Sequence, residues 1–178
     1  MLDKLYITPR QWLRILRWTL YCLLLLLALM VQTVVLGNRT IFGIHPAFVP
    51  LVITCVCLRE GPERGGTFAL LASLFWHLSG ADMGSVSILV LTVVPLLGSL
   101  LCRKILANRF LPCLLFCLLT VFTDQALIFL LKYVLDGLPG AYFLEQLLPC
   151  VLVSLCAQPL IYLLVKWIAR IGDAYEST

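Results

Sequence analysis

The chain has 178 residues, of which 62% are hydrophobic and 12% are charged, and its mean hydropathy is +1.04. A soluble domain this apolar would aggregate, whereas long apolar runs separated by clusters of charge are typical of a polytopic membrane protein. The polar segments are about ten residues long at most and leave no room for a soluble enzyme domain or a nucleic-acid-binding module, so the formal net charge of +4 needs no nucleic acid to explain it.

Six apolar runs predict an all-α membrane protein, a six-transmembrane-helix bundle in a single domain. The expected spans cover approximately residues 12–36, 41–58, 65–81, 86–102, 110–135 and 147–168. The first run is longer than the apolar core of a signal peptide and no small-residue cleavage site follows it, so we expect it to remain as a span. The second and third runs are short. They form either two short spans or one re-entrant hairpin, with the charged tip between them in water.

Small side chains recur every four residues along the third run. Residues at this spacing share one face of a helix, and small residues in lipid let helix backbones approach closely. The positions are Gly61, Gly65, Ala69, Ser73 and Ala81, interrupted only by His77. We therefore predict that this set, the packing seam, joins the third helix to its neighbours. The alternative is that small residues are simply frequent in apolar helices.

The turn between the second and third runs is rich in charge. It contains Arg59, Glu60, Glu63 and Arg64, which we call the docking loop. These residues are either a solvated turn of paired charges or a docking point for a cytoplasmic partner, and the sequence leaves both interpretations open.

The distribution of Lys and Arg predicts the orientation. With six spans, eleven of the 13 Lys and Arg residues fall on the side that holds both chain ends, and only Arg39 and Lys132 fall on the other. Because cytoplasmic loops carry the excess of positive charge, we expect both termini to be cytoplasmic.

Asp124 lies deep inside the fifth run. An ionisable residue at such a position is a functional-site hypothesis that needs a partner, and we expect His77, with Gln32 and Gln158 as neutral alternatives. The simpler interpretation is that this intramembrane polar cluster only binds helices together, at roughly 1 kcal/mol per hydrogen bond. We favour it, because ion and proton paths usually place acids on several spans.

Ser73, His77 and Asp124 also supply the side chains of a nucleophile, a base and an orienting acid. No glycine-flanked nucleophile turn surrounds Ser73, however, and packing already explains its position. We therefore expect no enzyme and no catalytic residue.

The eight cysteines lie in or beside apolar runs and are expected to act as small hydrophobic side chains. Cys55 and Cys57 would face different sides of a helix. Cys113 and Cys117 would share a face, but no His or carboxylate stands at ligand spacing from them. We therefore expect no metal site and no cofactor.

The order of these features resembles the family of the bacterial rod shape-determining protein MreD, nearly from end to end. The features are Gln32 at the end of the first run, Pro46 at the start of the second, the REGPERGG turn, the SGADMG loop, Asp124 in the fifth run and Pro159 in the sixth. The family usually has an Asp at the position of His77, so no role that requires a carboxylate is carried over to that residue.

The resemblance implies a noncatalytic scaffold subunit of the cell-elongation machinery, which serves cell shape and peptidoglycan synthesis from the bacterial plasma membrane. Its implied partner is MreC, and through MreC the filament protein MreB, the glycosyltransferase RodA and a class B penicillin-binding protein. The implied bundle is similar to the substrate-binding components of energy-coupling-factor transporters, so the alternative is a vitamin-binding subunit of an importer. The SGADMG and DGLPGAYFLEQ loops argue mildly against it, because they supply few aromatic and polar residues for such a site.

Overall fold

The computed structural model describes residues 9–35, 47–79, 84–102, 110–136 and 147–173, and all regular structure in these ranges is helical. The elements are α1 (Pro9–Met30), its π-helical continuation η2 (Val31–Val35), α2 (Phe48–Glu60), α3 (Pro62–Leu78), α4 (Gly84–Cys102), α5 (Phe110–Asp136) and α6 (Leu148–Asp173). The predicted all-α fold class is therefore confirmed for these ranges.

Three of the described helices are long and apolar enough to cross a membrane. The qualifying segments are Gln11–Val34, Phe110–Leu131 and Leu148–Ile171, and a shorter apolar segment, Val86–Leu101, lies in α4. A hydrocarbon core about 30 Å thick needs about 20 apolar residues in a helix. Length and composition thus indicate a membrane protein.

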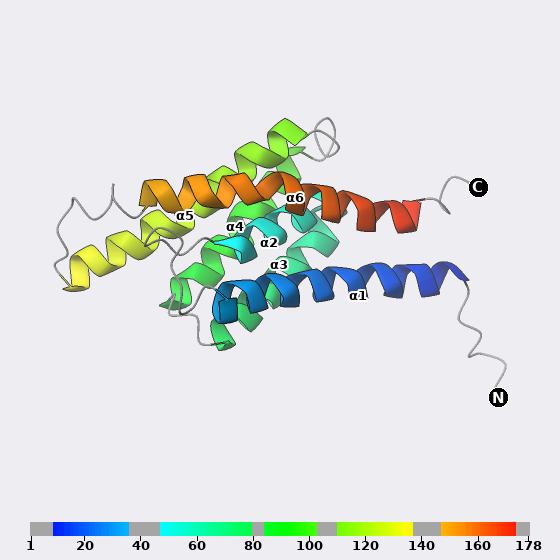
Figure 1. The fold of residues 1–178 in the computed structure, drawn as a ribbon, viewed down its shortest axis with the longest axis horizontal. Helices are drawn as coiled ribbons and strands as arrows, with labels where there is room; N and C mark the ends of the chain where they lie inside the picture. Colours follow the sequence, from blue (N-terminus) through cyan, green and yellow to red (C-terminus); the bar gives the residue numbers. More distant parts are fainter. Residues whose placement is uncertain (1–8, 36–46, 80–83, 103–109, 137–146, 174–178) are drawn as a thin grey trace.

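Helix α2 is the centre of the bundle (Figure 1). Residues Val49 to Leu58 are all buried, and α1, α3, α4, α5 and α6 each pack against α2. Its 13 residues give a length of about 20 Å at 1.5 Å per residue, which is less than the thickness of a bilayer core. A helix that is apolar on every side lies either in a protein core or in lipid. Here the five surrounding helices cover it.

Helices α2 and α3 form a tight hairpin joined at Gly61. This residue has φ +86° and ψ 175°, a conformation that is essentially restricted to glycine. Its N–H donates to the Cys57 carbonyl oxygen over 3.1 Å, and Pro62 then begins α3 in the position that proline favours. Our assignment of Gly61 to the packing seam is wrong, since a side chain there would meet nothing within 4 Å. Gly61 permits the turn instead.

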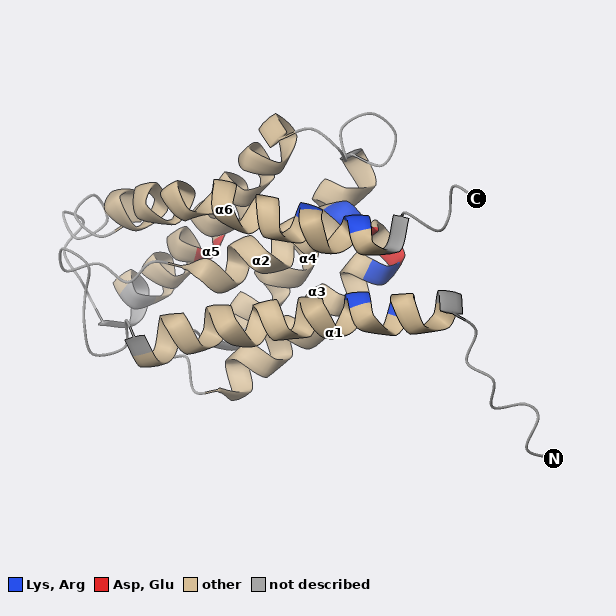
Figure 2. Cartoon of the chain, turned by 45° about the vertical axis from the view of Figure 1, so that its right-hand side comes forward, with Lys and Arg blue, Asp and Glu red and all other residues tan. Residues whose placement is uncertain are grey.

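Charge gathers at one end of the bundle. Helix α1 begins and helix α6 ends at this charged end, and the Lys and Arg residues drawn in blue in Figure 2 lie there together with the turn between α2 and α3. The long faces of the helices carry exposed leucines instead, among them Leu23, Leu71 and Leu163. This separation of charge from apolar surface is what a membrane environment requires of an integral protein.

Candidate functional site

Three residues of the predicted packing seam, Gly65, Ala69 and Ser73, lie inside the bundle. Gly65 and Ala69 are buried on α3, and a Cβ atom at Gly65 would lie 2.6 Å from both Cα and O of Cys57 on α2. Ser73 is buried as well, and its Oγ lies 3.2 Å from Thr92 Oγ1 on α4. These three residues let α3 approach two neighbours closely, in agreement with small-residue packing in membranes. Ala81 lies outside the described residues.

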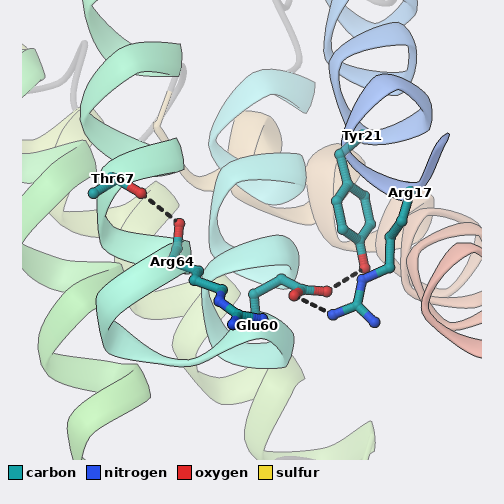
Figure 3. Close-up of polar contacts among 5 residues, drawn as sticks. All are labelled: Arg17, Tyr21, Glu60, Arg64 and Thr67. Carbon is teal, nitrogen blue, oxygen red and sulfur yellow. Dashed lines mark hydrogen bonds and ion pairs between the residues drawn. The ribbon is translucent and has the colours of Figure 1, made fainter. Parts of the chain in front are cut away.

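A charged cluster fixes α1 to the end of α2. Figure 3 shows Arg17 and Tyr21 reaching from α1 to the carboxylate of Glu60. Arg17 forms an ion pair with Glu60, and the Tyr21 hydroxyl donates to the other carboxylate oxygen over 2.8 Å. The Glu60 side chain is only 1% exposed. Arg17 and Tyr21 were not among the predicted site residues, because nothing in the local sequence connects them to Glu60.

Aromatic packing supports this cluster from the side of α3. The ring of Phe68 lies 6.0 Å from Trp18 and 6.4 Å from Tyr21 between centroids, and Trp18 and Tyr21 are themselves 5.8 Å apart. Aromatic pairs at such distances contribute about 0.5–1.5 kcal/mol each beyond their burial. The three rings therefore hold Tyr21 in the position from which it binds Glu60.

The docking loop does not present all four of its residues to a partner. Glu60 belongs to the buried cluster with Arg17, so its inclusion is wrong. Arg59 is half-buried, whereas Glu63 and Arg64 are exposed at the start of α3. The surface that this turn offers is therefore smaller than the sequence indicates.

Asp124 is fully buried on α5, but its partner differs from the one we expected. The Ser87 hydroxyl on α4 donates to Asp124 Oδ1. His77, the expected partner, has an exposed side chain near the end of α3, and the two residues do not meet. Sequence reasoning missed Ser87, since a serine in an apolar helix carries no sign of what it faces.

Several interior polar atoms have no hydrogen-bond partner. Within the described residues these are Asp124 Oδ2, Trp76 Nε1 and both amide atoms of Gln158. Gln158 is 0% exposed, so its amide group has no access to solvent. A buried amide without a bond costs roughly 1–3 kcal/mol, which makes Gln158 a place to look for a further ligand.

Gln32 has a different role from the one predicted. Its Oε1 accepts from the backbone N–H groups of Phe48 and Val49, over 3.1 and 3.2 Å, while Ser154 Oγ accepts from Ala47 N–H over 3.0 Å. The first N–H groups of a helix have no partner within it. Side chains from η2 and α6 therefore cap the N-terminus of α2, and Gln32 does not contact Asp124.

Replacing Gln32 by Met should therefore lower the free energy of unfolding by about 1–2 kcal/mol, since two donors at the start of α2 lose their acceptor. Thermal unfolding in detergent micelles measures the change. Thr33→Val is a matched control, because the Thr33 hydroxyl bonds only the Leu29 carbonyl of its own helix. Equal destabilisation by the two variants would contradict the capping role.

Three thiols meet inside the bundle. Cys55 Sγ on α2 lies 3.5 Å from Cys113 Sγ and 3.6 Å from Cys117 Sγ, both on α5. All three sulfur atoms lie within 4.8 Å of one another and all three residues are buried. The sequence predicted small hydrophobic side chains here, because the i, i+4 pair on α5 does not reveal a third thiol on α2.

A scan against protein-family models, a search of curated proteins and a search of solved structures each found no match. Function therefore has to be argued from the geometry of this chain.

Several of the described polar groups bind different helices to one another. These contacts include Arg17 and Tyr21 with Glu60, Ser87 with Asp124, Ser73 with Thr92, and Gln32 and Ser154 with the start of α2. They lie in separate parts of the bundle. Ser73 illustrates this, because its hydroxyl faces Thr92 and the Leu70 carbonyl and makes no contact with His77 or Asp124. The three residues considered as a nucleophile, a base and an orienting acid do not come together.

Proposed function

We propose that this chain is a noncatalytic scaffold subunit of the bacterial cell-elongation complex, of the MreD type, which binds MreC in the plasma membrane. The bundle would span the membrane six times with both termini in the cytoplasm. Through MreC it would act near MreB, RodA and a class B penicillin-binding protein, and so contribute to cell shape and peptidoglycan synthesis.

The observation that carries this proposal is the use of the interior polar groups as interhelical contacts. A scaffold needs a fixed arrangement of helices with an apolar outer surface, whereas catalysis needs polar groups that converge on one point. Helix α3 has the properties expected of a scaffold helix. Its small residues Gly65, Ala69 and Ser73 are buried, while Leu71 and Phe75 on its other face are exposed and free to contact lipid or a partner helix.

The charged end supports the proposed orientation. Basic residues gather at the end of the bundle that contains the turn between α2 and α3 (Figure 2). Arg17 on α1 pairs with Glu60 beside this turn, Arg64 lies in the first turn of α3, and Arg170 lies in the last turn of α6. Positive charge collects on the cytoplasmic side of membrane proteins. Docking of a cytoplasmic segment would then use the exposed residues Glu63 and Arg64.

We expect an affinity-tagged chain to capture a single-span MreC-like protein from mild-detergent extracts of rod-shaped bacteria that express both. A tagged polytopic protein of similar size from the same membrane serves as the control bait. Arg64→Glu reverses an exposed charge and should reduce capture if the docking loop contributes, without lowering the unfolding temperature. Capture of MreC by neither bait, or equally by both, would contradict the proposal.

The unpartnered atoms of Asp124 and Gln158 favour the second candidate, a vitamin-binding subunit of an energy-coupling-factor importer. Small-molecule sites combine apolar walls with a few polar groups of this kind. A rise in the unfolding temperature of the purified protein with one vitamin of a panel, in the absence of MreC capture, would favour this alternative.

A further inference from the structure

We propose that Cys55, Cys113 and Cys117 form a binding site for one thiophilic metal ion, Cu(I) in preference to Zn²⁺, with Gln158 as the neighbouring polar group. This site is independent of the scaffold function. It rests on the convergence of three buried thiols from two helices and on a buried amide beside them that lacks hydrogen bonds.

The spacing of the sulfur atoms suits a metal. The Cys55 sulfur lies 3.5 and 3.6 Å from the other two sulfur atoms, and no two of the three are more than 4.8 Å apart. A point at equal distance from all three sulfur atoms therefore lies roughly 2.4 Å or less from each. This distance is close to a metal–thiolate bond of about 2.3 Å. The ion therefore fits between the thiols without a rearrangement of α2 or α5. Cys57 and Cys150 are also buried but are not part of this group.

The number of ligands favours Cu(I). Thiolates bind both ions, but structural zinc sites almost always have four ligands, whereas this cluster offers three sulfur atoms. Asp124 is seven residues beyond Cys117 on α5, about 10 Å along the helix, and is bonded to Ser87. No second kind of strong ligand thus reaches the three sulfurs from the described part of α5.

Gln158 supplies what an anionic cluster in an apolar bundle needs. Each thiol that binds the ion releases a proton, so several thiolates around a monovalent cation leave net negative charge. The Gln158 side chain lies near Cys113, and its amide group makes no hydrogen bond within the described residues. Donors of this kind around a metal site orient its ligands and tune its affinity.

The site is also near an aqueous boundary. Counted along α5 from Phe110, Cys113 lies about 5 Å and Cys117 about 11 Å into the helix. Tyr162 of α6 packs on Phe110 with 5.2 Å between ring centroids, and Lys166 Nζ lies 5.8 Å from the Tyr162 ring. An ion reaching the thiols from the charged end would therefore pass one or two helical turns of protein.

The test uses the purified full-length protein in detergent micelles under anaerobic, reducing conditions, loaded with Cu(I) or Zn²⁺ in the presence of a competing chelator. We expect about one Cu(I) per chain after desalting, and X-ray absorption showing only sulfur ligands in the first shell. Zn²⁺ should be lost to the chelator. Cu(I) retention below one-tenth per chain, or a first shell dominated by oxygen and nitrogen, would overturn the site. Retention of Zn²⁺ but not Cu(I) would overturn the choice of ion.

Variants assign the residues. Cys55→Ser, Cys113→Ser and Cys117→Ser should each abolish retention of Cu(I), while the double variant Cys22→Ser/Cys156→Ser should keep it, because these two cysteines are exposed and distant from the cluster. Gln158→Leu should weaken binding about 10- to 100-fold at unchanged stoichiometry. Loss of Cu(I) in the Cys22/Cys156 double variant alone would overturn the assignment. If a thiol variant fails to fold, X-ray absorption on the unaltered protein still shows whether the first shell of the ion contains only sulfur.

Discussion

Replacing Arg17 by Met should lower the free energy of unfolding by about 3–5 kcal/mol. The change leaves the Glu60 carboxylate, which is 1% exposed, without its cationic partner and with Tyr21 as a single donor. Removing one member of a buried ion pair is strongly destabilising because it leaves an uncompensated buried charge. Arg17 itself is 17% exposed and lies at the charged end, so the reverse change, Glu60→Gln, should cost much less. Unfolding by SDS titration in mixed micelles measures both.

Two further variants isolate the pair from other effects of the substitution. Arg14→Met removes an exposed arginine one turn earlier on α1 and should change stability by less than about 1 kcal/mol. The double variant Arg17→Met/Glu60→Gln should recover most of the stability lost in Arg17→Met, since no buried charge remains. Equal losses for Arg14→Met and Arg17→Met, or a double variant less stable than Arg17→Met, would contradict the role given to this cluster.

The helices themselves follow from the length of the apolar runs, but their arrangement does not. Residues Val49 to Leu58 are apolar on every side, a pattern that fits either lipid or the centre of a bundle. From the packing seam we predicted close contacts between α3 and its neighbours, but nothing in the sequence indicated that the shorter α2 contacts all five other α-helices. Lipid and protein interior are equally apolar, so hydrophobicity cannot distinguish a central helix from a peripheral one.

The burial of the small residues on α3 could be predicted from the sequence, whereas the partners of the buried polar side chains could not. A spacing of four residues identifies one helix face, and Gly65, Ala69 and Ser73 are indeed buried on it. Partners such as Arg17 and Glu60 are 43 residues apart, and Ser87 and Asp124 are 37 apart. Their meeting depends on the depth and rotation of two helices, which no local pattern specifies. His77 shows the same limit, since it lies in the four-residue register but at the exposed end of α3.

Replacing Gly65 by Ala should lower the free energy of unfolding by about 2–3 kcal/mol, although alanine is the better helix former by about 1 kcal/mol. The new Cβ would lie 2.6 Å from the Cα and carbonyl oxygen of Cys57, which are backbone atoms of α2. Backbone atoms of a buried helix have no alternative rotamer, so α2 and α3 must separate. Because α2 also contacts the other four α-helices, the displacement would disturb the whole bundle.

Gly66 provides a matched control, because the same substitution there brings the new methyl group against a side chain instead of backbone. At Gly66 an added Cβ would lie 2.7 Å from Leu96 Cδ1, the end of a flexible side chain that can change rotamer. Gly66→Ala should therefore be neutral or slightly stabilising, because the gain in helix propensity is the same for both variants. A difference of about 2–4 kcal/mol between the two alanine variants in the same unfolding assay would measure the close approach of α2 and α3. Equal stabilities would show that the backbones are not held together at Gly65.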